Sequence, residues 1–272
     1  MAIEHNTSTQ DITIGVIGGL GWLGSALVTA ALANPRLNDI RFIVSGRTAP
    51  SSVLPDSVTY TSDNQALIES SDLIVLSVRP QDWQNIALDL TSKPVISFMA
   101  GAPCNELAQR HNPSHIIRAL PNGACSVKQS YTPWFCATEL DATLTTLVIA
   151  LLESFGYQDR YDTEDQIDVL TAISGAGPGY PALLAQALEQ AAVSMGLPTD
   201  KARKAVNATI RGSGYLVDDL NQPPQDMVDL LESYQGTTAA GLSQMKQQGF
   251  IESVEAGVLA AYNKAKKFSE PQ

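Results

Sequence analysis

The sequence predicts an α/β fold in which a doubly wound parallel sheet is followed by an all-helical domain. Short apolar strands alternate with helical segments through the first half of the 272-residue chain, a pattern typical of a parallel sheet with helices on both faces. No convincing strand follows Thr163, and the remainder has the apolar spacing of amphipathic helices. We therefore expect a flexible N-terminal tail at 1–10, a dinucleotide-binding sheet domain at 11–158 and a helical domain at 159–272.

A glycine-rich turn follows the first predicted strand, Ile12 to Ile17, and opens the first helix. Its spacing is Gly-x-Gly-x-x-Gly. In this setting the first glycine permits a tight turn, the second lets the backbone approach a pyrophosphate, and the third lets the helix pack close to the strand. Free N–H groups at a helix start also favour an anion. The cofactor contacts expected in this turn are Gly19, Leu20, Gly21, Trp22, Leu23 and Gly24.

The loop after the second predicted strand, Ile40 to Val44, distinguishes the two nicotinamide cofactors. NAD-binding folds usually place an acidic residue here for the ribose 2′-OH, whereas NADP-binding folds supply a cation for the 2′-phosphate. This loop has no acid; Arg47 offers a planar fork of donors, and Ser45 and Thr48 offer hydroxyls. The sequence therefore favours NADPH, with NADH possible. The alternative is that Arg47 is an ordinary solvated loop charge.

Six further elements complete the predicted sheet domain. They are a helix at Asn64 to Ser70, strands at Leu73 to Val78, Val95 to Phe98 and His115 to Ile117, an edge strand at Thr132 to Cys136, and a closing helix at Thr143 to Phe155. Ligands of open α/β sheets bind at the carboxyl ends of the strands. Small, polar or turn residues follow these strands, including Arg79-Pro80 and Ala100-Gly101. We expect them to face one crevice.

The predicted helical domain has two unusual helix openings and an excess of apolar surface. Ser174 to Tyr180 contains three glycines and a proline, and Ser233 to Thr238 places two hydroxyls at a helix start. Such openings expose backbone N–H groups to a ligand, although capped helix entrances without a ligand are the alternative. The apolar helix faces indicate a partner subunit. One such face consists of Leu184, Leu188, Ala191 and Met195.

Composition and charge exclude several classes of partner. The formal net charge of −11 repels nucleic acid and anionic membrane surfaces, and no apolar run is long enough to cross a membrane. Cys104, Cys125 and Cys136 show no paired metal-ligand spacing, so we expect no metal site and a reducing cytoplasm.

Taken in order, these motifs resemble those of the pyrroline-5-carboxylate reductase family. After the glycine turn, the family pattern has Val-Lys-Pro-Gln, Ala-Gly, Arg-x-Met-Pro-Asn, Ser-Gly-Ser-Gly-Pro-Ala-Tyr and Ser-Pro-Gly-Gly-Thr-Thr segments. The corresponding segments here are Val78–Gln81, Ala100-Gly101, Arg118–Asn122, Ser174–Tyr180 and Ser233–Thr238. The resemblance extends from Ile12 to about Ala265.

The resemblance implies a Rossmann-type domain, a helical dimerisation domain, and reduction of 1-pyrroline-5-carboxylate to L-proline by hydride transfer from NAD(P)H. It implies a homodimer or higher homo-oligomer formed through the helical domain. Residues expected by position to contact the cofactor are Ser45, Arg47, Asn64, Val78, Pro80, Ala100 and Gly101, beside which lie Thr48 and Arg79. Residues expected around the substrate are Glu164, Ser233, Gly236, Thr237 and Thr238, with Thr238 catalytic near the imine nitrogen.

Departures from the family pattern leave alternatives open. Arg79 replaces Lys, Ala176 replaces Ser, and Tyr234-Gln235 replaces Pro-Gly in the turn expected to hold the substrate carboxylate. Loss of Pro and Gly could reshape that turn. The alternatives are an NADPH-dependent reductase of a different cyclic imine and a non-catalytic NADPH-binding regulator. A β-hydroxyacid dehydrogenase would need a lysine shortly after Gly177, but the next one is Lys201.

Overall fold

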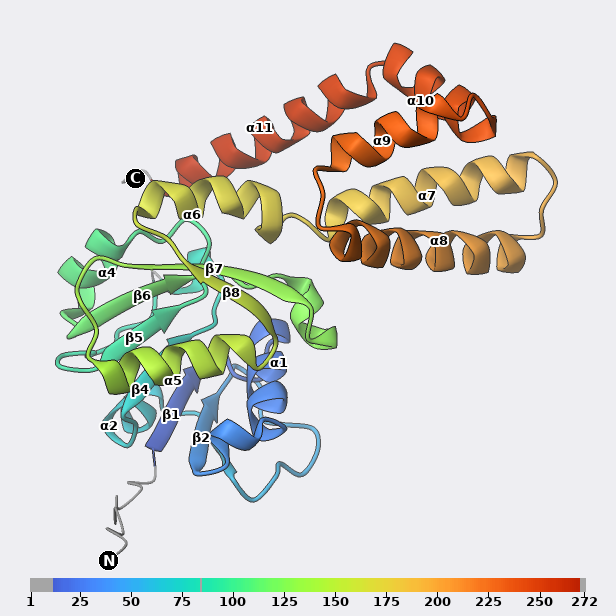
Figure 1. Ribbon diagram of the computed structural model, residues 1–272. Coiled ribbons are helices and arrows are strands. Elements are labelled where there is room, and N and C mark those ends of the chain that lie inside the picture. The colour runs from blue at the N-terminus through green and yellow to red at the C-terminus, as the bar shows by residue number, and fades with distance from the viewer. Residues whose placement is uncertain (1–11, 84, 270–272) are drawn as a thin grey trace, which may run out of the picture. The chain divides into compact units, whose positions relative to one another are not determined.

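The computed structural model describes residues 12–83 and 85–269 (Figure 1). The chain divides into two compact units, one made of the residues up to Ala176 with those from Ala261 onward, the other of Gly177–Ala260. The expected tail at 1–10 lies outside the described residues. The boundary expected between 158 and 159 stays a prediction.

The first unit is built on one sheet with the strand order β3-β2-β1-β4-β5-β6-β7-β8. The strands are β1 (Ile12–Ile17), β2 (Ile40–Ser45), β3 (Val58–Thr61), β4 (Leu73–Leu76), β5 (Pro94–Ser97), β6 (His115–Ala119), β7 (Ser130–Cys136) and β8 (Gly156–Arg160). Neighbouring strands are parallel, except that β6 and β7 are antiparallel. The strand order changes direction after β3, because β4 pairs with the other side of β1. Rossmann-type sheets bind ligands in the crevice at such a switch point.

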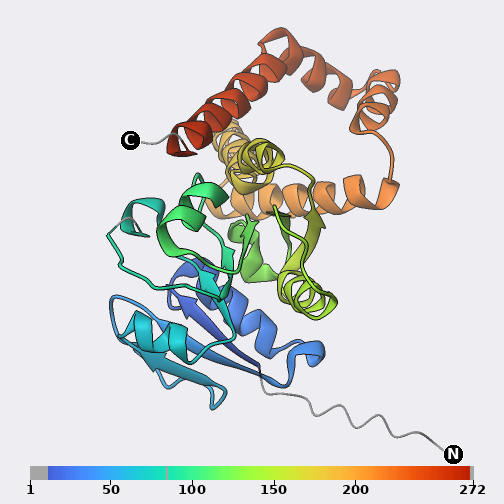
Figure 2. The same cartoon turned by 90° about the vertical axis from the view of Figure 1, so that its left-hand side faces the viewer.

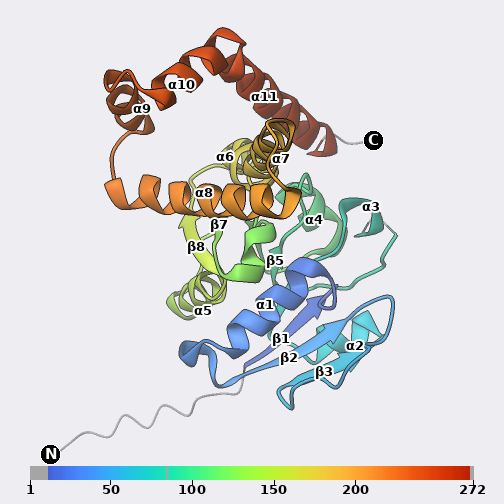
Figure 3. The ribbon, with the colours of Figure 1, turned by 90° about the vertical axis from the view of Figure 1, so that its right-hand side faces the viewer.

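Helices cover both faces of this sheet (Figures 1 and 3). One face is covered by α1 (Trp22–Leu32) and α5 (Ala142–Glu153), the other by α2 (Asn64–Glu69), α3 (Pro80–Trp83) and α4 (Cys104–His111). On the first face Ile14 and Phe42 pack in one buried cluster with Leu151. On the second face Ile74 and Leu107 belong to a second buried cluster. The predicted doubly wound α/β architecture is therefore confirmed.

Strand β8 shows where the sequence prediction of the sheet is wrong. We expected β7 at the edge, but β7 pairs with β6 on one side and β8 on the other. The sequence of β8, GYQDR, lacks apolar alternation, and all of its residues are at least partly exposed. An edge strand of this kind is held by its backbone pairing and gives no hydrophobic signal. Strand β3 and helices α3 and α4 are likewise absent from the sequence prediction.

The second unit contains only helices among its described residues, as expected (Figures 1 and 2). They are α7 (Gly179–Ser194), α8 (Thr199–Leu220), α9 (Pro224–Ser233), α10 (Thr237–Gln247) and the first part of α11 (Phe250–Ser269). Ala202 and Val206 are buried. Large apolar side chains such as Leu183 and Met195 are exposed in the isolated chain, so this unit has little core of its own. None of the described helices combines the length and apolar character that a membrane span requires.

The turn between β1 and α1 depends on two glycines. Gly18 has φ of +83°, and a Cβ there would lie 2.3 Å from the carbonyl oxygen of Ser77. We expected Gly19 to supply the unusual turn conformation, but Gly18 does. At position 19 glycine is needed for space, because a Cβ there would clash with the Val44 side chain. A Cβ on Gly24 would lie 2.6 Å from the Gly18 oxygen. Helix α1 therefore packs directly on the end of β1.

We expect Gly24→Ala to destabilise the protein by about 1–3 kcal/mol, because the added methyl overpacks rigid backbone. Urea unfolding followed by circular dichroism measures the change. The control is Gly212→Ala in α8, where a Cβ meets nothing within 4 Å; replacing a mid-helix glycine there should stabilise by about 0.5–1 kcal/mol. Equal changes in the free energy of unfolding for the two substitutions would contradict the close packing of α1 on the end of β1.

Candidate active site

A cavity of about 830 Å³ opens at the carboxyl ends of β1, β2 and β4. It has the size of a cofactor or ligand pocket, and it lies where the strand order reverses. The sequence-predicted cofactor residues that line it are Leu20, Gly21, Trp22, Leu23, Ser45, Arg47, Thr48, Asn64, Val78 and Arg79. The structure thus brings together residues from four separate segments of the chain.

Other predicted cofactor residues do not line this cavity. Gly19 and Gly24 are packed inside the β1–α1 turn, and Pro80 begins α3. Ala100 and Gly101 form the turn after β5, where Gly101 has φ of +69°. Their roles in binding stay predictions.

The cavity also includes residues that the sequence analysis did not single out. They are Ile17, Gly18, Gly46, Ser62, Ser77, Asp82, Asn85, Ile86 and Phe98. Gly18, Gly46 and Ser77 directly follow or flank strand ends, so the strand-end rule could have found them. Asp82 lies on α3, which the sequence does not indicate.

One wall of the cavity is the N-terminus of α1, which has no side-chain cap. Gly21 is the N-cap residue, and the first amide N–H groups of any helix lack an acceptor within the helix. Gly21 has no side chain, so the backbone is bare at this point, and a Cβ there would lie 3.1 Å from the Gly18 oxygen, a tight contact. The indole N–H of Trp22 donates to the Ser126 hydroxyl at 2.5 Å. Bare backbone donors at a helix N-terminus form a site for a pyrophosphate.

The lining of the cavity also includes two arginines and one carboxylate. Ser45, at the end of β2, donates to the Asn64 side-chain oxygen at 2.6 Å. Arg79 donates through Nε and Nη2 to the two oxygens of Asp82, at 2.8 and 3.1 Å. Arg47 Nη1 lies 3.9 Å from the same carboxylate. The loop after β2 has no acidic residue, as expected, but Asp82 on α3 lies close to Arg47 of that loop.

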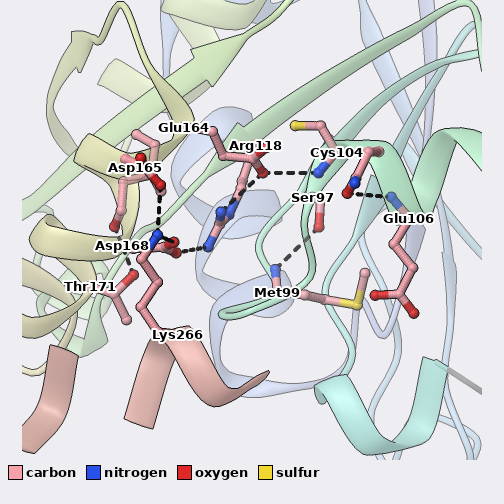
Figure 4. A network of polar contacts seen from close by, with 12 residues as sticks. Ser97, Met99, Cys104, Glu106, Arg118, Glu164, Asp165, Asp168, Thr171 and Lys266 are labelled. Atoms are coloured by element: carbon pink, nitrogen blue, oxygen red, sulfur yellow. Dashed lines mark hydrogen bonds and ion pairs between the residues drawn. The ribbon is translucent and has the colours of Figure 1, made fainter. Parts of the chain in front are cut away.

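A buried ion network lies elsewhere in the first unit (Figure 4). The Arg118 side chain, on β6, is 1% exposed; its Nη1 donates to Glu164 at 3.0 Å and its Nη2 to Asp168 at 2.6 Å. The same Glu164 oxygen accepts the backbone N–H of Cys104 at 2.9 Å. Lys266, on α11, donates to Asp165 and lies 3.4 Å from Asp168. Nothing in the sequence around Lys266 indicates these partners, which lie about a hundred residues away.

This network bears on the predicted role of Glu164 and on the reactivity of Cys104. Glu164, expected beside the substrate, stands at the start of α6 (Glu164–Leu170) with one oxygen engaged by two donors; its contact with substrate stays a prediction. The Cys104 thiol is buried, and burial, reinforced by the Glu164 charge, raises its pKa far above the usual range. A thiol of this kind stays protonated and is inert as a nucleophile.

Two of the sequence motifs meet in the first unit. The Asn122 side-chain amide donates to the carbonyl of Ser174 at 2.9 Å, and a Cβ on Gly175 would lie 3.0 Å from the Leu120 side chain. Gly175 therefore serves a close approach to the end of β6, a packing role that neither the expected ligand contact nor the alternative of a capped helix entrance included.

The turn Ser233–Thr238 belongs to the second unit. Gln235 has φ of +52°, in the left-handed region that favours glycine. Gly236 is the N-cap of α10 and has no side-chain cap. Thr237 and Thr238 are exposed in the first turn of that helix. The turn keeps a left-handed residue at the position where the family pattern has glycine, and Gln235 bears a backbone strain of about 1–2 kcal/mol there.

Two family models match the chain. Residues 13–101 match the model described as NADP oxidoreductase, coenzyme F420-dependent, and residues 164–268 match that of pyrroline-5-carboxylate reductase dimerisation. The two matches cover the sheet crevice and the helical region respectively.

Similarity to individual proteins extends over nearly the whole chain. Pyrroline-5-carboxylate reductase from Synechocystis is 28% identical over 96% of this chain and 100% of its own length, and that from Pisum sativum is 29% identical over 96% and 97%. The solved Plasmodium falciparum pyrroline carboxylate reductase with NADP bound has a TM-score of 0.84 at 29% identity, covering 96% of this chain and 99% of that one. The Streptococcus pyogenes enzyme has a TM-score of 0.82 at 29% identity, covering 94% and 98%.

We expect Arg118→Met to destabilise the protein by about 3–5 kcal/mol, because it removes the buried cation that bonds to the buried Asp168 carboxylate. Arg36→Met is the matched control, since Arg36 pairs with Glu153 at 2.6 Å but is 59% exposed. Loss of that pair should cost less than about 1 kcal/mol. Denaturant unfolding measures both, and a small effect at Arg118 would show that the network does not hold the fold.

Proposed function

The chain belongs to the pyrroline-5-carboxylate reductase family, and we propose that it reduces 1-pyrroline-5-carboxylate to L-proline with NADPH. The observation that carries this proposal is similarity over nearly the full length to a solved member of the family with NADP bound. The cavity at the strand ends supports it independently, because its residue types suit a dinucleotide.

The residues present fit NADPH. A glycine at position 21 leaves the backbone bare beside the uncapped N-terminus of α1, which favours the pyrophosphate. Arg47 and Arg79 line the same cavity and offer planar donors for a 2′-phosphate. Ser45 and Asn64 bond to each other beside them, which holds this edge of the pocket in place. When bound, the nicotinamide supplies a hydride to an electrophilic carbon.

The substrate side of the proposal rests on the turn Ser233–Thr238. A protonated cyclic imine is already electrophilic, so the protein mainly has to position it. The exposed Thr238 hydroxyl would hydrogen-bond to the ring nitrogen, and the bare amides of Gly236–Thr238 would hold the carboxylate. We further propose that Ser233 and Glu164 each contact the substrate. Hydride addition to the imine carbon of the protonated ring then gives the neutral secondary amine, with no further proton required.

One observation favours a second candidate, reduction of a different cyclic imine. Tyr234 is 69% exposed and Gln235 holds a strained conformation in the turn expected to bind the carboxylate. Both side chains add bulk where the family pattern has Pro and Gly. A cyclic imine that differs in ring size or in the position of its carboxylate is therefore the alternative substrate.

The helical region supports a homodimer, or a higher homo-oligomer. Residues 164–268 match the dimerisation model of the family, and α7 and α8 expose an open cavity of about 730 Å³ with apolar and charged lining. Exposed side chains such as Leu188 and Leu216 leave apolar surface that a second copy would cover. The three cysteines of the chain are free and buried, in keeping with a reducing cytoplasm.

A panel of cyclic imines, differing in ring size and carboxylate position and assayed with NADPH and NADH, tests the proposal. We expect the greatest kcat/KM with 1-pyrroline-5-carboxylate, read at the nicotinamide absorbance, and L-proline as the product. A higher kcat/KM with another imine would favour the second candidate. Nucleotide binding without oxidation of the nucleotide by any imine would contradict the proposed imine reduction.

Thr238→Ala should lower kcat by about 10²-fold, as expected for loss of a donor aligned with the reacting atoms, while the NADPH Kd changes little. Thr238→Ser keeps the hydroxyl and should restore most of the rate. Thr209→Ala, which removes a hydroxyl from α8 of the same unit, is the matched control. Weakened NADPH binding in Thr238→Ala with an unchanged kcat would show that the role assigned to Thr238 is wrong.

A further inference from the structure

A carboxylate stands among the arginines of the proposed NADPH pocket. Asp82, Arg79 and Arg47 all line the cavity at the ends of β2 and β4. The Asp82 side chain is 32% exposed, against 61% for Arg79 and 82% for Arg47. The acid is therefore the least exposed of the three and lies within reach of both cations.

The geometry of the pair engages the donors that a phosphate would use. Arg79 presents Nε and Nη2 to the two oxygens of Asp82 at 2.8 and 3.1 Å. This is the fork arrangement in which a guanidinium binds a carboxylate or a phosphate through two parallel N–H groups. A 2′-phosphate and the Asp82 carboxylate therefore compete for the same edge of Arg79.

The net charge of the cluster formed by Asp82, Arg79 and Arg47 also disfavours a 2′-phosphate. Two arginines alone would present two positive charges, and Asp82 reduces that excess to one. The hydrogen bond from Arg79 lowers the pKa of Asp82, so the carboxylate is ionised at neutral pH. Like charge disfavours a dianionic 2′-phosphate beside it. A ribose 2′-OH carries no charge and can donate to a carboxylate.

We propose that Asp82 is a specificity-determining residue. Its carboxylate competes with the 2′-phosphate of NADPH for Arg79, and the pocket therefore accepts NADH as well as NADPH. This inference rests on the proposed nucleotide site and deepens it. In most NAD-binding folds the corresponding acid stands at the end of β2. Here α3 supplies it, from the segment after β4.

The test is Asp82→Asn, titrated with NADPH and with NADH by quenching of protein fluorescence. We expect the NADPH Kd to fall about tenfold, which corresponds to about 1.4 kcal/mol, and the NADH Kd to stay the same or rise. The NADPH Kd of the variant should also depend more steeply on salt, because the charge of the cluster is larger. In an Arg79→Gln background the same substitution should have a smaller effect.

Asp72→Asn is the matched control. Asp72 precedes β4 and accepts the backbone N–H of Thr13, at the end of the strands opposite the cavity, so the variant removes the same charge away from the pocket. Its ratio of NADPH to NADH Kd should equal that of the wild type.

Three results would overturn the inference. An unchanged Kd ratio in Asp82→Asn would show that Asp82 does not affect discrimination. A higher NADPH Kd would show that Asp82 instead orients Arg79 toward the phosphate. Wild-type protein that binds neither nucleotide would refute the proposed site itself and this inference with it, whereas wild-type binding with an unchanged ratio would refute the inference alone.

Discussion

The direct contact between helix α1 and the end of strand β1 is the constraint on which the crevice depends. Gly24 approaches the Gly18 carbonyl more closely than any side chain would allow. The amides of Gly18 and Gly19 both donate to the Ser45 carbonyl, which ties the turn to the end of β2. One turn therefore sets the direction of the helix N-terminus and the position of the loop with Arg47. The bare anion site and the arginines then share one cavity, which an enzyme that binds a phosphorylated dinucleotide requires.

A second constraint is electrostatic and joins segments far apart in sequence. Arg118 on β6 is buried between Glu164 and Asp168 of α6, and Lys266 of α11 pairs with Asp168 and with the neighbouring Asp165 (Figure 4). Glu164 also accepts the first amide of α4, whose N-cap Pro103 has no side-chain acceptor. A buried arginine is tolerated only when such partners compensate its lost hydration. The network thus links the strand that carries one family motif with the start of the helical region.

Local patterns were sufficient to predict the main strands and the nucleotide end of the first unit. The β1 run, the glycine spacing and the β2 loop carry signals within a few residues, and the structure gathers Gly21, Ser45 and Arg47 in one cavity. The rest depends on pairing between distant segments. Strand β8 is polar and held by its neighbour, Asp82 reaches Arg47 only through α3, and Lys266 finds Asp165 from about a hundred residues away. No periodicity or spacing encodes such contacts.

The central claim is that this fold delivers a hydride from a nicotinamide to the carbon of a cyclic imine. The most direct measurement is the fate of the label when the protein reduces 1-pyrroline-5-carboxylate with NADPH doubly deuterated at nicotinamide C4. We predict proline that carries one deuterium at the ring carbon of the former C=N bond, detected by mass spectrometry and NMR. Proline free of deuterium, or labelled NADPH that is not consumed, would contradict the account.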